Sequence, residues 1–582
     1  MSDKQSSSLD LGKEKHFFRA SAEDFKKIPG NPIAYWVGKE EFDAYEKNEF
    51  LGAVSYPRKG LDTGENAKFL RLWHETSYDR ACFDGHDLSK VWFPYNKGGD
   101  FRRWYGNREY VINWKDDGSE IKNRLGWDEK KPTIRNAGFY FRECFTWTTV
   151  SSGSFSARYC PVGALFDNGG CSIFAESGIF PIGGFVNSKV MFRHLSILSP
   201  TLNFQPGDIS KVPFHKELLS KSTPSQECTS LSRNDWDSYE VSWDFSICPL
   251  LHPDHCQPSL KGSYQKLRAH WREMTLEMQR LEEENNRIFI DAYGLQHELT
   301  PAVPLKEITL TCNPHYRYGG EKSEDELDVL LLADTMRELV SYAVGCMFGR
   351  YSLDKPGLIL ANQGETLADY LAQVPHPSFP ADDDNVIPLL DGDWFPDDIT
   401  LRFRQFLRMA FGDAHYEDNL AFIEQALNGK GKRNYSLRDY FLGEFYTDHV
   451  KRYKKRPIYW LFSSPKGTFS ALVYLHRYRP DTVSVVLNYL RDFRKKLASR
   501  LDYLQQVAIS PSASQGDKTK ANKEAETIKK QLLELDDYER DTLYPLATEQ
   551  KSLDLDAGVK ANYLELGAAL KKIPGLEGKG ED

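Results

Sequence analysis

Residues 91–123, with the sequence VWFPYNKGGDFRRWYGNREYVINWKDDGSEIKN, alternate aromatic rings, basic side chains and glycine turns. Basic side chains neutralise the phosphates of a nucleic acid, and aromatic rings stack on its bases. A tryptophan-rich β-core with a solvated basic rim has the same composition, so the pattern leaves both interpretations open. The candidate phosphate contacts are Lys97, Arg102, Arg103, Arg108 and Lys115, and the candidate stacking or core residues are Trp104, Tyr105, Tyr110 and Trp114.

A second basic region covers residues 430–456, where nine lysines and arginines stand against three acidic residues. Tyrosine and phenylalanine residues are interleaved with these charges, which is a pattern that also suits contact with phosphates. A basic face on a helical domain is often only solvated, so the pattern leaves two interpretations open, contact with DNA and simple exposure to solvent.

Other motifs of metal or nucleotide chemistry are incomplete. Cys248, His252, His255 and Cys256 lie close together, but their spacing fits no common zinc finger, and the neighbouring prolines predict a loop. The aspartates at 382–384 lack the spacing and the glycine of a calcium loop. Residues 319–323, GGEKS, fall short of a phosphate-binding loop because Glu321 separates glycine from lysine. We therefore expect no metal site in this chain.

Composition places the chain among ordinary globular proteins of several domains. It has 582 residues, of which 40% are hydrophobic and 27% charged, and its net charge of -9 argues against wholesale binding to polyanions. Any DNA contact must therefore rest on local basic patches. The nine cysteines form no C-x-x-C pair, no apolar run could span a bilayer, and the N-terminus lacks a signal peptide. These features predict reduced thiols, no membrane contact and a cytoplasmic location.

The elements that must position these residues define an α+β multidomain chain. Between residues 90 and 159 there are 16 aromatic residues and five of the 12 tryptophans, separated by turn residues, which predicts a mixed β-rich domain. Residues 264–294 have few helix breakers and predict a long helix with a solvated acidic middle at Glu282–Glu284. Residues 482–509 and 522–541 predict an antiparallel helical hairpin that could dock to a partner.

The predicted boundaries follow from these patterns. We expect a connector at 1–55, a β-rich domain at 56–214, a surface linker and the long helix at 215–300, a helical C-terminal domain at 301–480, the helical hairpin at 481–545 and a C-terminal tail at 546–582. The chain shows no pattern of a Rossmann-like catalytic domain.

Several long strings together resemble one family. Residues 91–107, 109–123, 308–320, 341–360 and 455–464 are similar, in the same order, to the C-terminal half of PglX, the family of adenine-specific DNA methyltransferases in type 1 BREX phage-defence systems. The resemblance runs from about Phe25 to Asn562. Members of that family carry an N-terminal methyltransferase domain, then a target-recognition domain and helical C-terminal regions.

The motifs that amino-methylating enzymes need are missing from this sequence. A cofactor site requires a glycine-rich turn between a strand and a helix, and Gly183 and Gly184 lack its spacing. An adenine pocket requires an Asn/Asp-Pro-Pro-aromatic turn, which residues 313–316, NPHY, imitate with His315 in place of the second proline. We therefore predict no catalytic residue and no bound cofactor in this chain, although the complete family enzyme uses S-adenosylmethionine.

The resemblance implies that residues 56–214 are a target-recognition domain that enters a groove of double-stranded DNA. The first hypothesis is that the chain is the target-recognition and assembly portion of an N6-adenine methyltransferase whose catalytic half, or other BREX proteins, act as partners. The implied DNA contacts are Lys97, Arg102, Arg103, Trp104, Tyr105, Asn107, Arg108, Ser152, Ser154, Arg158 and Asn203.

Two alternatives stay open. The chain could be a catalytically inactive DNA-binding or partner-docking protein of the defence system. A nuclease is a weaker alternative, because the sequence has no compact set of two carboxylates and a lysine.

Overall fold

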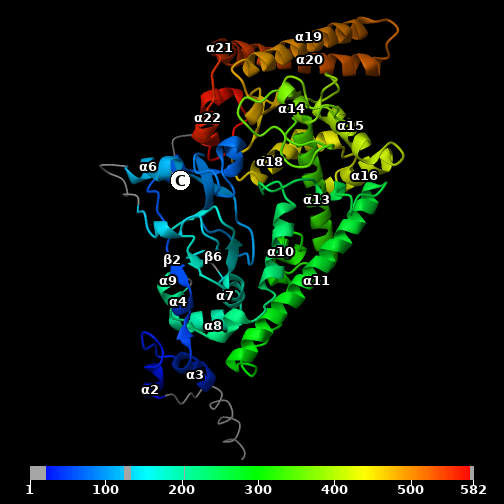
Figure 1. Ribbon diagram of the computed structural model, residues 1–582. Helices are drawn as coiled ribbons and strands as arrows, with labels where there is room; N and C mark the ends of the chain where they lie inside the picture. The colour runs from blue at the N-terminus through cyan, green and yellow to red at the C-terminus, as the bar shows by residue number, and fades with distance from the viewer. Residues whose placement is uncertain (1–20, 124–132, 152, 202, 577–582) are drawn as a thin grey trace, which may run out of the picture.

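The computed structural model describes residues 21–123, 133–151, 153–201 and 203–576. A β-rich unit lies beside a larger helical unit, and a helical hairpin extends beyond both (Figure 1). The first described residues form α2 (Ala22–Phe25), α3 (Lys39–Lys47) and α4 (Leu51–Val54), and β1 (Glu49–Phe50) pairs with β10 (Pro213–Phe214).

Two four-stranded sheets build the β-rich unit, in the orders β2-β9-β6-β7 and β3-β5-β4-β8. All neighbours are antiparallel except β4 and β8. All five residues of β4 are buried, since both faces of this aromatic strand are covered. The strands are β2 (Tyr56–Arg58), β3 (Leu70–Leu72), β4 (Trp92–Asn96), β5 (Tyr110–Asn113), β6 (Cys144–Trp147), β7 (Ala157–Cys160), β8 (Leu165–Phe166) and β9 (Ser172–Phe174). The accompanying helices are α5 (Asn66–Phe69), α6 (Lys115–Lys122), α7 (Ile179–Val186), α8 (Lys189–Leu198) and α9 (Pro206–Ile209).

The long helix α11 (Leu260–Tyr293) packs against both units, and the sequence predicts a helix over almost the same residues. Ser259 caps its start by accepting a hydrogen bond from the Gly262 amide, and Gly294 ends it with a φ of 69°, which glycine adopts without strain. Before α11, the sequence predicts a surface linker. The structure instead has α10 (Ser225–Asp237) there, because Cys228 and Trp236 are buried against the neighbouring helices.

The helical unit encloses the largest apolar core together with a three-stranded sheet in the order β11-β13-β12. Ser323 and Glu326 form a capping box at the start of α13, which runs through this core. The helices are α12 (Pro314–Tyr318), α13 (Glu324–Met347), α14 (Leu367–Gln373), α15 (Ile399–Phe411), α16 (Tyr416–Leu427), α17 (Leu437–Tyr440) and α18 (Tyr446–Arg452), and the strands are β11 (Val386–Pro388), β12 (Tyr459–Ser463) and β13 (Ser470–Tyr474).

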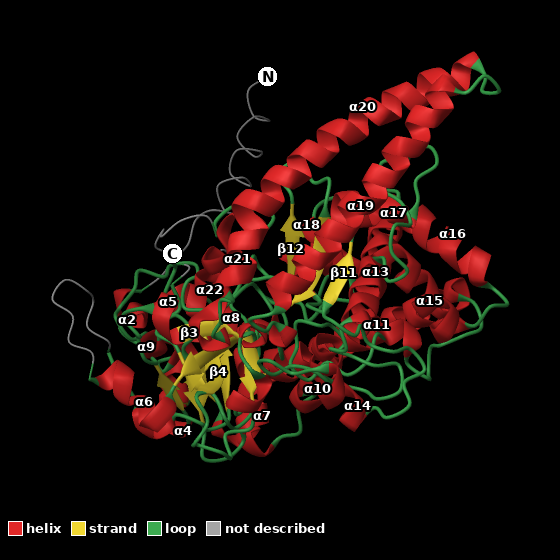
Figure 2. Cartoon of the chain, turned by 90° about the horizontal axis from the view of Figure 1, so that it is seen from above, coloured by secondary structure: helices red, strands yellow, loops and turns green. Residues whose placement is uncertain are grey.

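The hairpin consists of α19 (Thr482–Ile509) and α20 (Gln515–Tyr538), which lie side by side and project from the body (Figure 2). Tyr503, Ile509 and Leu533 are exposed on it, and its docking to a partner stays a prediction. Within the described residues, no helix combines the length and the apolarity needed to cross a bilayer.

The C-terminal segment is not a detached tail. After α21 (Tyr544–Glu549), the chain returns to the β-rich unit, and α22 (Gly558–Leu566) lies between that unit and the hairpin (Figure 1). The Asp556 carboxylate accepts a hydrogen bond from the Trp92 indole at 2.8 Å, and the Asp556 carbonyl accepts one from Arg71. Expectation and structure differ because the partners of this segment lie more than 450 residues earlier in the chain.

His194 on α8 is fully buried between the rings of Tyr45 and Tyr293, and neither of its ring nitrogens has a hydrogen-bond partner. Burial lowers the pKa of His194 to about 3, so the folded state holds this imidazole neutral. The unfolded chain binds a proton at this residue once the pH falls below about 6.5, and folding stability is lost from there downward.

Protonation of His194 in the unfolded chain should therefore lower the free energy of unfolding by about 2 kcal/mol between about pH 7 and about pH 5, and we expect His194→Leu to remove this decrease. Urea unfolding at a series of pH values measures this slope. His376→Leu, at an exposed histidine, is the matched control. An unchanged slope in the His194 variant would show that the buried imidazole is protonated in the folded state.

Candidate nucleic-acid interface

Arg102 lies inside the protein, where it joins the β-rich unit to α10. Its side chain is 4% exposed and forms an ion pair with the fully buried Asp235 at 2.7 Å, and it also donates to the Tyr105 carbonyl and to the Thr311 hydroxyl. Asp235 accepts two further bonds from the backbone amides of Thr311 and Cys312. Arg102 is therefore unavailable to a phosphate in this conformation.

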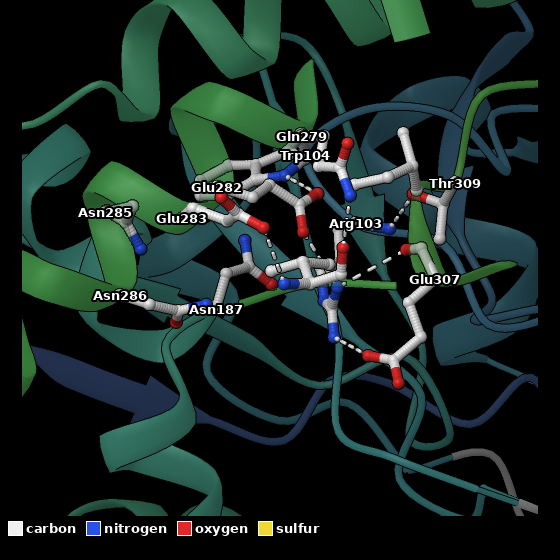
Figure 3. A network of polar contacts seen from close by, with 12 residues as sticks. Arg103, Trp104, Asn187, Gln279, Glu282, Glu283, Asn285, Asn286, Glu307 and Thr309 are labelled. Carbon is white, nitrogen blue, oxygen red and sulfur yellow. Dashed lines mark hydrogen bonds and ion pairs between the residues drawn. The ribbon is translucent and has the colours of Figure 1, made fainter. Parts of the chain in front are cut away.

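The next two residues are held by α11 and the loop before α12 (Figure 3). Arg103 forms ion pairs with Glu282 at 2.9 Å and Glu307 at 3.3 Å, and the Trp104 indole donates to Glu282 at 2.7 Å. Trp104 is 1% exposed and has an unusual φ of 71°, which its contacts with α11 and with the backbone of β7 maintain. Glu282 is 3% exposed, which corrects the prediction that the middle of this helix is solvated.

Three more predicted contacts are also internal. The Arg108 guanidinium lies 2.9 Å from the Cys160 sulfur and stacks over Tyr105, which is 2% exposed. Arg158 on β7 is 1% exposed, and burial lowers its pKa to about 10. These groups support the interpretation of residues 91–123 as an aromatic core, because their side chains are buried inside the protein.

The remaining predicted contacts lie nearer the surface. Lys97 follows β4, Asn107 donates to the Asp100 carbonyl, and Ser154 is half-buried. Asn203 and Lys115 are exposed. Ser152 lies outside the described residues. Surface access therefore separates these side chains from the buried arginines, a distinction that residue type alone does not make.

A basic cleft of about 340 Å³ brings the two basic regions of the sequence together. Lys97 and Arg71 come from the β-rich unit, Lys454 and Arg456 follow α18, and Lys560 belongs to α22. We call this set of five side chains the basic cleft. Glu75 is the one acidic residue in its lining, so the described wall is strongly cationic.

Local contacts hold these side chains in place. The Lys97 ammonium lies 5.0 Å from the centre of the Tyr110 ring, and Lys454 forms an ion pair with Glu109. Arg456 lies 3.8 Å from Glu75. Such an arrangement suits a polyanion, since several cations from different elements face one hollow. Sequence analysis missed Arg71 and Lys560, because neither lies in a basic or aromatic run.

Most of residues 430–456 serve other contacts. Arg438 forms ion pairs with Asp393 and Asp398 inside the helical unit, while Lys430, Lys432 and Arg433 are exposed away from the cleft lining. The basic residues of this region therefore have different roles: some form internal ion pairs, some are exposed to solvent, and Lys454 and Arg456 line the basic cleft.

Residues 313–316, whose sequence imitates the turn of an adenine pocket, form the start of α12, and Asn313 is its N-terminal cap. Asn313 is fully buried, its amide donates to the carbonyls of Leu305 and Ile308, and its carbonyl oxygen accepts from the His315 amide. The Tyr316 hydroxyl bonds to the Phe101 carbonyl. Among the described residues, no group of three or more His, Cys, Asp or Glu side chains is arranged to hold a metal ion, and the cluster near Cys248 is included in that statement.

No protein-family model matches this chain. Among curated proteins, the chain is 38% identical over 574 residues to the adenine-specific methyltransferase BrxX of Escherichia coli O9:H4 (strain HS). It is 36% identical over 584 residues to the adenine-specific methyltransferase PglX of Lacticaseibacillus casei (strain Zhang). The alignments cover 95% and 97% of this chain. The chain spans about half the length of these relatives, 46% of each. The similarity therefore supports a relation to adenine-specific methyltransferases over nearly all of this chain.

The buried ion pair between Arg102 and Asp235 yields a stability prediction. We expect Asp235→Ala to lower the free energy of unfolding by about 3–5 kcal/mol, because it leaves a buried guanidinium without its counter-charge. Chemical unfolding followed by circular dichroism measures the change. Glu277→Ala removes an exposed ion pair on α11 and is the control, with a much smaller expected effect. Equal losses in the two variants would contradict the structural role of the buried pair.

Proposed function

We propose that this chain is the DNA-recognition and assembly portion of an adenine-specific methyltransferase of a BREX phage-defence system, and that the basic cleft contacts the DNA backbone. The observation that carries the proposal is the convergence of Lys97, Lys454 and Lys560 from three distant parts of a chain whose net charge is negative. The similarity to the methyltransferases BrxX and PglX supplies the reaction class.

The cleft would act by charge and position. Each lysine or arginine that replaces a counterion at a phosphate contributes to affinity without reading sequence. Asn107, Ser154 and Asn203 carry polar groups near the surface of the same β-rich unit and are the proposed readers of base edges. The buried arginines would then hold the recognition surface in shape and leave DNA contact to these accessible side chains.

The methyl-transfer chemistry is proposed to come from a catalytic portion outside these residues. Gly183 and Gly184 lie within α7, where an added side chain would meet the Phe145 ring or the Asn285 amide, so these glycines serve helix packing. Asn313 is occupied as a helix cap. The residues that most resemble methyltransferase motifs thus do not fit S-adenosylmethionine or adenine, and we assign them no step in the reaction.

Salt dependence tests the basic cleft. We expect Lys97→Ala and Lys454→Ala each to weaken binding to double-stranded DNA of any sequence, and each to reduce the slope of log affinity against log salt by about 1, since one phosphate contact is lost. Fluorescence anisotropy with labelled duplex DNA at several salt concentrations measures both quantities.

Lys523→Ala on the hairpin is the matched control, because Lys523 is an exposed lysine remote from the cleft lining. Thermal melting of each variant checks that the fold is retained. The basic cleft is excluded as the DNA contact if the cleft variants keep the wild-type salt slope and affinity while the hairpin variant does not.

A methylation assay tests whether methyl transfer requires a catalytic portion outside this chain. We expect this chain alone, incubated with S-adenosylmethionine and adenine-rich DNA, to transfer no methyl groups, and we expect transfer when a catalytic portion of a related methyltransferase is added. Incorporation of labelled methyl groups gives the readout. Transfer by the chain alone would contradict the proposal, and DNA binding without transfer under either condition would favour an inactive DNA-binding protein.

A further inference from the structure

Two cysteines, Cys144 and Cys160, stand directly opposite each other on the neighbouring antiparallel strands β6 and β7. The side chains of such a pair lie on the same face of the sheet. Opposite residues of an antiparallel pair have Cα atoms about 4.5–5.5 Å apart, which lies within the range of about 4.4–6.8 Å that a disulfide spans. Both cysteines are free. The backbone therefore holds the two thiols where a disulfide can join them without a change of register.

The sulfur of Cys160 lies beside a buried cation. Nη1 of Arg108 is 2.9 Å from this sulfur, and Arg108 is only 6% exposed. Among the described residues, Arg108 forms no ion pair with a carboxylate, and the nearby Asp244 pairs with Arg233 at 3.6 Å. A buried charge without a counter-charge is costly, so this guanidinium requires an anion. A thiolate at Cys160 supplies one at hydrogen-bond distance.

The surroundings make the two thiols chemically different. A hydrogen bond from Cys144 lowers the pKa of Cys160, and the charge of Arg108 lowers it further, against the opposing effect of burial. The buried side-chain amide of Asn96 acts in the same direction, and its nitrogen has no other hydrogen-bond partner in the described part of the chain. Burial raises the pKa of Cys144 well above its usual range, so that sulfur keeps its proton. The pair thus combines a nucleophilic thiolate with a thiol that can resolve its oxidised form.

Burial limits the class of oxidant that can reach this pair. Cys144 is 2% exposed and Cys160 is 0% exposed, which excludes bulky disulfide reagents, whereas hydrogen peroxide is close to water in size. Cys144 is the first residue of β6 and Cys160 the last residue of β7, and β7 is the last strand in the order of its sheet. The pair therefore lies at the end of a strand ladder, where local opening admits a small molecule.

We propose that Cys144 and Cys160 form a redox-active dithiol that hydrogen peroxide converts into an intramolecular disulfide. The Cys160 thiolate attacks one peroxide oxygen, the O–O bond breaks, hydroxide leaves, and Cys160 becomes a sulfenic acid. The Cys144 sulfur then bonds to the Cys160 sulfur, the S–O bond breaks, and the hydroxide leaves with the Cys144 proton as water. The two sulfurs together lose two electrons, which the peroxide gains. A thiol reductant restores both thiols by disulfide exchange.

Peptide mapping of the full chain tests this assignment. The folded protein is treated with hydrogen peroxide, unfolded with N-ethylmaleimide to block the remaining thiols, and digested for mass spectrometry. We expect one pair of peptides joined through Cys144 and Cys160, and separation of this pair by dithiothreitol. Cys256 is the internal control, because all nine cysteines are described and the other eight are buried. Exposure alone would make Cys256 react first.

Three variants separate the steps. Cys144→Ser should stop the reaction at the sulfenic acid of Cys160, which dimedone traps, and Cys160→Ser should leave Cys144 unoxidised because its proton is retained. Arg108→Gln keeps an N–H donor but removes the charge, and it should slow the loss of the Cys160 thiol by about 10-fold, since the thiolate fraction falls about 10-fold for each unit by which the thiol pKa rises.

Two results would overturn the assignment. One is recovery of Cys144 and Cys160 as maleimide adducts at a peroxide concentration that oxidises Cys256, and the other is a disulfide that joins different cysteines. If Arg108→Gln fails to fold, peptide mapping of the unaltered protein and dimedone trapping in Cys144→Ser still decide the question. The outcome is independent of DNA binding by the basic cleft, because neither thiol lines that cleft.

Discussion

The fold depends on one buried polar junction, the ion pair of Arg102 with Asp235 and the neighbouring contacts of Arg103 and Trp104 with Glu282. Removing these charges from water is costly, and further hydrogen bonds to Asp235 from the amides of Thr311 and Cys312 help to offset that cost. The junction inserts a loop of the β-rich unit between α10 and α11. Trp104 even belongs to the apolar core of the helical unit, so the two units share their interior.

This use of arginine determines where a polyanion can bind. Arg102, Arg108 and Arg158, which the composition offers for phosphate contact, are buried inside the protein. Lys97 and Lys454 instead meet in the cleft at the seam between the units, while Lys115, Lys430 and Lys432 are exposed elsewhere. The basic cleft exists because α22 returns to the β-rich unit through Asp556, Trp92 and Arg71, which brings Lys560 beside Lys97 and Lys454. A seam of this kind is a common place for ligand sites, since it combines side chains from elements that no single domain contains.

A cavity of about 510 Å³ follows from the same packing. α10 and the turn that follows it bring Trp236, Tyr239 and Glu240 against α13 and α18. The arginines there pair with carboxylates of the neighbouring helices. The Glu109–Lys454 ion pair connects the lining of this cavity to that of the basic cleft.

The sequence by itself determined the elements whose causes are local. The helices α11 and α19, and the aromatic density of the β-rich region, depend on residues within a few turns of one another. The tertiary structure alone decided which arginines are internal, because their partners are distant in the chain: Asp235 lies 133 residues from Arg102, and Glu282 lies 179 residues from Arg103. An arginine in an aromatic run looks the same whether it faces a phosphate or a buried carboxylate. Lys97 was predictable as a surface cation, but its meeting with Lys454 and Lys560 was not, since only folding sets the distance between residues that far apart.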